Sequence, residues 1–152
     1  QLHELFKIAH LNPQVFIHCE KYFQKGIELD IDKYECMNDY GLIQMLKGND
    51  PIEYFKKSYE EGKSENGLFN FAVFTKDKDM LKESADKYEN SMSMLLYYQM
   101  SKDINYLQKS AIQYKNPFAL VLYGLYKIES ESNENAENKN KKIRSNLIKK
   151  YF

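Results

Sequence analysis

Three histidines and two cysteines are the residues of this sequence best suited to bind a metal ion or to act as nucleophiles. His3, His10 and His18 all lie within the first 18 residues, and the thiols are Cys19 and Cys36. A zinc site built from His10, His18, Cys19 and Cys36 can be considered. Zinc sites that are recognisable from sequence, however, use ligand pairs separated by about two to four residues, and no such pair is present here. We therefore expect no metal and no cofactor, and we expect Cys19 to be a packed apolar thiol.

The sequence also lacks the arrangements that support covalent catalysis. It contains no Gly-x-Ser-x-Gly motif and no phosphate-binding loop. The neighbouring acids Glu60 and Glu61 fall on the solvent face of a predicted helix, which is the usual place for paired carboxylates. We therefore do not expect an enzyme.

Tyrosine offers chemistry of another kind. Tyr97, Tyr98, Tyr123 and Tyr126 lie on predicted helices that follow one another in the repeat described below. Tyrosine is enriched at protein interfaces, where it supplies a large contact area and one hydroxyl group. These four residues are therefore our candidates for a protein-binding surface.

The C-terminal end of the sequence is strongly basic. Its positive residues, with no acid among them, are Lys139, Lys141, Lys142, Arg144, Lys149 and Lys150. Three interpretations are open. The segment could cap the last helical hairpin with Ile143, Leu147 and Ile148, it could bind the phosphates of RNA, or it could lie on an anionic membrane surface.

The elements that would position these residues are clearest in residues 103–127, which are predicted to form two short helices. Asp103 precedes the first helix, where a carboxylate can cap free N–H groups. Asn116-Pro117 ends that helix, because the residue before a proline is disfavoured in helical conformation. Residues 118–126 are apolar nearly all round, which indicates a helix sandwiched between neighbours.

This hairpin recurs without gaps when it is moved back along the chain in steps of 26 residues. One aligned set consists of Leu107, Leu81, Phe55 and Leu29. Another consists of Ser110, Ser84 and Ser58. A fourth step places Asn12-Pro13 under Asn116-Pro117. A fixed period of this size is typical of stacked helical repeats. Stacking is also needed, because an isolated helix of roughly ten residues is only marginally stable in water.

A further aligned set contains only small residues, namely Gly41, Gly67, Ser93 and Ala119. Small side chains let two helices approach closely. The set therefore predicts a tight helix–helix crossing in each repeat.

The repeated residues resemble Sel1-like repeats, which are shorter relatives of tetratricopeptide repeats. The Lys-Ala-Ala motif of that family is approximated by Lys57-Ser58-Tyr59 with Gly62, by Glu83-Ser84-Ala85 with Tyr88 and Asn90, and by Lys109-Ser110-Ala111 with Tyr114 and Asn116. Ala119, Tyr123-Gly124 and Tyr126 approximate the Ala, Leu-Gly and Tyr positions of the family's other helix. The family's loop between hairpins is shortened here to residues 75–78 and 101–102.

This resemblance covers about residues 30–130 and implies an all-α fold, an α-solenoid of stacked helical hairpins. It also implies a scaffold or adaptor role, and it carries over no catalytic residue. In chain order we expect a repeat domain over residues 1–130, a flexible polar linker over 131–140 and a basic amphipathic helix over 141–152.

Within the repeat domain the pattern predicts helices at residues 51–61, 66–75, 79–89 and 91–100. At the N-terminus, Leu2, Leu5, Phe6 and Ala9 form one apolar stripe, which belongs to the most divergent copy of the repeat.

Composition limits the function without naming it. The 152 residues carry a formal net charge of zero, so no overall field selects a partner. No apolar run is long enough to span a membrane, and two cysteines without a framework fit the reducing cytoplasm. We expect a cytoplasmic, non-enzymatic adaptor that binds another protein or a second copy of itself. The alternative is a factor that binds a ribosome or another ribonucleoprotein through the basic tail.

Overall fold

The computed structural model describes the backbone of residues 13–151 and the side chains of residues 14–142. Every regular element in this part of the chain is a helix, which confirms the all-α prediction. The elements are α2 (Pro13–His18), α3 (Glu20–Glu28), α4 (Lys33–Leu46), α5 (Ile52–Glu60), α6 (Glu65–Thr75), α7 (Lys78–Lys87), α8 (Ser91–Ser101), α9 (Ile104–Gln108), the π-helical turn η1 (Lys109–Gln113) and α10 (Pro117–Tyr151). The helices predicted between residues 51 and 100 all occur, with ends that differ by at most two residues.

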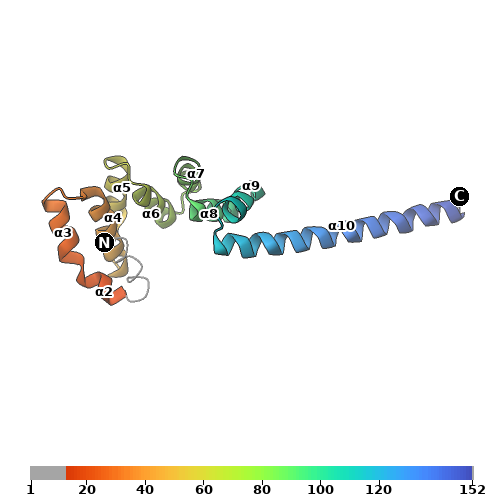
Figure 1. Cartoon of the computed structure of the whole chain (residues 1–152), viewed down its shortest axis with the longest axis horizontal. Helices are drawn as coiled ribbons and strands as arrows, with labels where there is room; N and C mark the ends of the chain where they lie inside the picture. The colour runs from red at the N-terminus through yellow and green to blue at the C-terminus, as the bar shows by residue number, and fades with distance from the viewer. Residues whose placement is uncertain (1–12, 152) are drawn as a thin grey trace. The chain divides into compact units, whose positions relative to one another are not determined.

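The chain divides into two compact units. The first extends to Ser93 and the second begins at Met94, so that α8 contributes its start to one unit and its remainder to the other. In the first unit each helix packs against the next in chain order: α3 on α4, α4 on α5, α5 on α6 and α6 on α7 (Figure 1). In the second unit α9 and η1 pack against α10.

The 26-residue register is visible in the burial of side chains. Phe55, Leu81 and Leu107 are all buried on the first helix of their hairpins, and the serines three residues later are buried as well. Burial of a Leu or Phe side chain stabilises a fold by about 1.5–3 kcal/mol. The residues that recur at this interval in the sequence are therefore among those that hold the helices together.

The predicted tight crossings are confirmed at both glycines of the small-residue set. A Cβ atom added to Gly41 would lie 2.8 Å from the Cε1 atom of Phe55. One added to Gly67 would lie 2.6 Å from the Ser58 hydroxyl oxygen and 2.8 Å from the Tyr59 amide nitrogen. Ser93 and Ala119, at the equivalent positions, are fully buried.

The turns inside the hairpins follow the same period. Lys63, Glu89 and Lys115 all adopt left-handed backbone conformations, with φ of 55°, 53° and 52°. The following residue then caps the next helix: the Ser64 hydroxyl accepts a hydrogen bond from the Gly67 amide, the Asn90 side chain from Ser93, and the Asn116 side chain from Phe118 and Ala119. Such caps satisfy amides that have no partner within the helix.

Asp77 and Asp103 cap the helices that begin each later hairpin. The carboxylate of Asp77 accepts hydrogen bonds from the amides of Asp79 and Met80, and that of Asp103 from Asn105. The cap predicted at Asp103 is therefore confirmed.

The register does not extend through α3 and α4. Leu29, which the pattern aligned with Phe55, lies after the end of α3 and is 55 % exposed. Asn38, which aligns with the cap Ser64, is buried inside α4 and accepts a hydrogen bond from Asn70. The reason is that α4 starts at Lys33 and is 14 residues long, longer than α6 or α8. The gap-free alignment over four steps is therefore wrong at this point.

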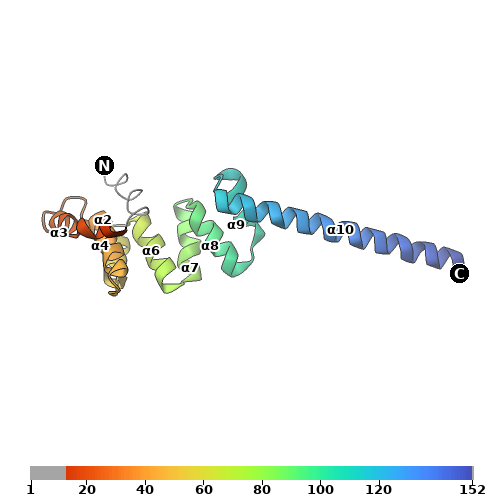
Figure 2. The ribbon, with the colours of Figure 1, turned by 90° about the horizontal axis from the view of Figure 1, so that it is seen from below.

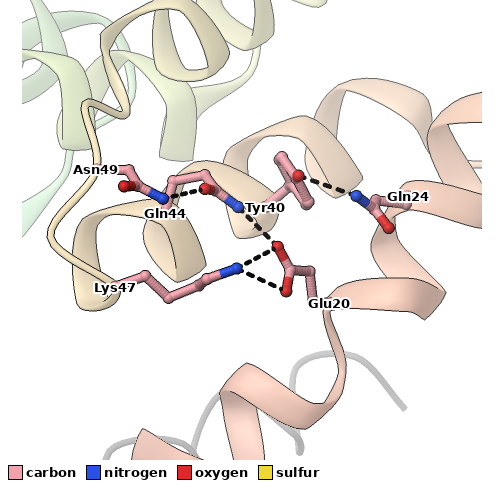
Figure 3. A network of polar contacts seen from close by, with 6 residues as sticks. All are labelled: Glu20, Gln24, Tyr40, Gln44, Lys47 and Asn49. Carbon is pink, nitrogen blue, oxygen red and sulfur yellow. Dashed lines mark hydrogen bonds and ion pairs between the residues drawn. The ribbon is translucent and has the colours of Figure 1, made fainter.

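The first hairpin is held by an apolar cluster and a polar network. Phe16, Phe23, Cys36 and Ile43 form the cluster. On the surface, the Glu20 carboxylate of α3 accepts hydrogen bonds from Gln44 Nε2 at 2.9 Å and from Lys47 Nζ at 3.0 Å (Figure 3). The hydrogen bond from Lys47 is the main reason why the pKa of Glu20 lies below its usual value. The predicted stripe over residues 2–9 lies outside the described residues.

The predicted linker over residues 131–140 is wrong, because α10 continues through it as a single helix to Tyr151 (Figures 1 and 2). This segment has too little apolar surface to form a core, but a helix satisfies its backbone hydrogen bonds internally. No glycine or proline follows Gly124 to interrupt it. Since α10 does not turn back, the basic segment does not cap the last hairpin in this structure.

Ser58 and Ser84 occupy equivalent positions, 26 residues apart, and allow a direct test of how the hairpins pack. The Ser84 and Ser93 hydroxyl oxygens are 2.7 Å apart, and both side chains are fully buried. Ser58 is equally buried, but its hydroxyl has no hydrogen-bond partner among the described residues. We predict that Ser84→Ala lowers the free energy of unfolding by about 1–3 kcal/mol, whereas Ser58→Ala leaves it unchanged or raises it. Urea unfolding followed by circular dichroism measures both, and equal losses would contradict the prediction.

Candidate protein-binding surface

The two thiols and the one described histidine are not arranged as a reactive site. The buried Cys36 thiol donates a hydrogen bond to the Ile31 carbonyl, and Cys19 donates to the Val15 carbonyl. Burial raises the pKa of Cys36, which disfavours the nucleophilic thiolate. His18 is exposed. No three metal-ligating side chains come together among the described residues, and His3 and His10 lie outside them.

A hollow of about 570 Å³ lies beside these thiols in the first unit. Its lining is mainly apolar and includes Cys19, Tyr22, Phe23, Leu29 and Ile31. The sequence pattern gave no indication of this hollow, because the 26-residue alignment placed Leu29 in a packed position. Two large apolar residues around a turn, as at positions 29 and 31, are the signal that could have indicated it.

The four candidate tyrosines are only partly available to a partner. Tyr97 packs edge-on against Tyr106 with 4.5 Å between ring centroids, and Tyr98 is half-buried. Tyr123 and Tyr126 stack on each other along α10, with centroids 6.3 Å apart. Tyr126 is the most exposed of the four, at 40 %. The structure therefore brings Tyr123 and Tyr126 together and leaves Tyr126 as the most accessible ring.

The most exposed large apolar residues of α10 lie on another side of the helix. We call them the α10 stripe: Phe118 (64 % exposed), Val121 (63 %), Leu125 (58 %) and Ile128 (65 %). Ala119, by contrast, is fully buried. The sequence predicted that this helix is sandwiched between neighbours, yet within the described residues only one side is covered.

Gly124 lies beside the α10 stripe and has no steric explanation within the described chain. A Cβ atom added there meets no atom within 4 Å, unlike one added to Gly41 or Gly67. Glycine inside a helix costs about 1 kcal/mol relative to alanine. The packing of the chain on itself therefore does not account for this residue.

The basic residues extend along the far part of α10. Lys139, Lys141 and Lys142 are exposed, as are the acids before them at positions 129, 131, 134 and 137. Arg144, Lys149 and Lys150 lie further along the same helix, and their side chains are outside the described part. An acidic stretch and a basic stretch therefore follow one another along the same continuous helix.

None of the family models, curated proteins and solved structures compared with this chain matches it. Among the described helices, even α10 with its 35 residues has no apolar segment able to cross a bilayer.

One carboxylate has a strongly altered acidity. Burial raises the pKa of Asp39 on α4 from 3.8 to about 6, the nearby Glu35 adds to the rise, and a hydrogen bond from Asn38 opposes it. The folded chain therefore holds this proton more tightly than the unfolded chain does. Asp39 thus favours folding most below pH 4, and this contribution is lost as the pH rises through about 6.

We predict that Asp39→Asn increases the free energy of unfolding at pH 7.5 and that the gain disappears at pH 4. Each pH unit between the two pKa values contributes about 1.4 kcal/mol, so the gain is at most about 3 kcal/mol. Urea unfolding of both proteins across this pH range measures the difference between their free energies of unfolding. The titration of the other carboxylates affects both proteins equally and therefore cancels in this difference. A difference that does not vary with pH would show that Asp39 is ionised normally.

Proposed function

We propose that this protein is a non-enzymatic adaptor, an α-solenoid of Sel1-like hairpins that binds another protein. The observation that carries the proposal is the recurrence of the same buried residues and the same capped turns at 26-residue steps. Repeats of this kind present extended surfaces to partners rather than enclosed pockets for catalysis. Two free cysteines, one of them buried, agree with a reducing cytoplasm.

Tyr126 is the candidate contact residue at the second unit. Its ring is held in place by stacking on Tyr123, and Lys127 Nζ lies 5.7 Å from the Tyr123 ring centroid. A ring that is already ordered loses little conformational freedom when a partner binds. Tyr97, Tyr98 and Tyr123 would support this contact from partly buried positions.

We predict that Tyr126→Ser weakens binding of the adaptor's partner at least about tenfold, as expected for an interface hot spot. The matched control is Tyr22→Ser, because Tyr22 is also exposed but lies in the first unit. Affinity purification with the intact chain identifies proteins whose recovery depends on Tyr126, and titration with the purified partner gives the affinity. Recovery that is equal for all three proteins would reject this surface, and circular dichroism would verify that the variants are folded.

A second candidate function is binding to RNA within a ribosome or another ribonucleoprotein. The observation that favours it is that α10 carries Lys139, Lys141 and Lys142 into solvent, and no acid follows Glu137. A helix can place cations along a phosphate backbone, and the release of counterions then provides the affinity. In this case the hairpins would bind protein while the basic part of α10 binds RNA.

For this candidate we predict that replacing Lys139, Lys141 and Lys142 with glutamine weakens RNA binding and makes its salt dependence less steep. Each lost phosphate contact lowers the slope of log K against log salt by about 0.7–0.9. Fluorescence anisotropy with a labelled RNA measures the slope, and glutamine at positions 129, 131 and 134 is the control. An unchanged slope in the lysine variant would reject RNA binding by this segment, and equal binding to anionic vesicles would indicate a membrane surface instead.

A further inference from the structure

The α10 stripe is an apolar surface that the described chain leaves uncovered. Successive residues of an α-helix are about 100° apart, so Phe118, Val121, Leu125 and Ile128 share one side of α10. The helix buries Ala119 on a different side, where α9 and η1 pack against it. Single exposed apolar residues are common on protein surfaces, but four along one helical stripe usually mark an interface.

The spacing of the stripe is that of a coiled-coil seam. Its intervals are three, four and three residues, which correspond to positions a, d, a and d of a heptad. These intervals read the same in both directions around position 123. An identical helix running antiparallel would therefore place Phe118 opposite Ile128 of the second copy, and Val121 opposite Leu125.

Charge distinguishes the antiparallel arrangement from the parallel one. In a parallel pair, Glu129 and Glu131 would flank the seam at heptad positions e and g, near the same acids of the second copy. Lys139 and Lys142 would fall at positions a and d, beside the same lysines. Such like-charge contacts oppose pairing. In the antiparallel pair the two basic ends point in opposite directions. Glu131 of the second copy then lies about two residues beyond the start of α10 at Pro117, the end at which the exposed Lys115 precedes the helix.

Gly124 is a second observation that points to a helix outside this chain. The glycines at positions 41 and 67 lie where another helix approaches too closely for a Cβ atom, whereas nothing in the chain approaches Gly124. It lies next to the stripe and one residue from the centre of the proposed pair. A second copy of α10 crossing there would use the space that the missing side chain leaves.

We propose that the protein forms a symmetric homodimer in which two α10 helices pair antiparallel through Phe118, Val121, Leu125 and Ile128, with the two-fold axis near position 123. This pairing goes beyond the adaptor function and does not use Tyr126. A single helix pair is a small interface, so we expect weak or moderate affinity.

The oligomeric state of the intact chain is the first test. Sedimentation equilibrium should show a concentration-dependent dimer, and Leu125→Glu should abolish it because the substitution buries two unpaired charges in the seam. Leu29→Glu is the matched control, since Leu29 has nearly the same exposure but lies in the first unit. A chain that remains monomeric at about 100 µM, a concentration that would populate a dimer with micromolar Kd, would overturn the proposal, as would equal effects of the two variants. Neither result would affect partner binding at Tyr126.

Disulfide trapping tests the orientation. In a background of Cys19→Ser and Cys36→Ala, one chain carries Phe118→Cys and a second chain of different tagged length carries Ile128→Cys. Disulfides require Cα atoms within about 7 Å, so the antiparallel pair should cross-link when the two chains are mixed and not when either is oxidised alone. Cross-linking of the Phe118→Cys chain with itself would indicate a parallel pair, and no cross-link in the mixture would indicate no such pair. Either result would overturn the proposal.

Discussion

Most of the described helices of this protein bury their apolar side against a neighbouring helix. Most of the helices between α5 and α9 have about ten residues, a length at which an isolated helix is barely stable in water. The structure meets this requirement by packing successive helices on one another, with Phe55, Leu81 and Leu107 buried at corresponding positions. Small residues at 41, 67, 93 and 119 complete the contact, because they let the helices approach closely.

This dependence explains which parts of the fold could be predicted from the sequence. Between α5 and the start of α10, local signals and packing agree: Asp77 and Asp103 cap helices, Pro117 begins one, and the buried side chains recur at a constant interval. In the first hairpin they disagree. Asn38 has the character of a cap, but the longer α4 buries it beside Asp39 and Asn70, so the tertiary contact determines its role and the linear pattern does not reveal it.

The far part of α10 shows a different limit. Residues 131–140 were predicted to be a linker because they cannot contribute to a core, but absence of a core does not prevent helix formation where no glycine or proline intervenes. Similarly, the sequence showed that residues 118–126 are apolar nearly all round. It could not show which side the chain itself would cover, because that depends on the side against which α9 and η1 pack. The four tyrosines could be selected by residue type, whereas the stripe at 118, 121, 125 and 128 is apparent only from the exposure of its side chains in the structure.

The last described helix, α10, is where this requirement is not met within the single chain. No further hairpin follows α10 among the described residues to cover its outer side. Polar residues on the outer side of that helix would be one solution, but α10 instead presents Phe118, Val121, Leu125 and Ile128, together with a glycine that has no neighbour. In the proposed dimer, a helix from a second chain would supply the kind of cover that earlier helices receive from their own chain. The like charges at Glu129, Glu131, Lys139 and Lys142 would then disfavour a parallel pair and favour the antiparallel one.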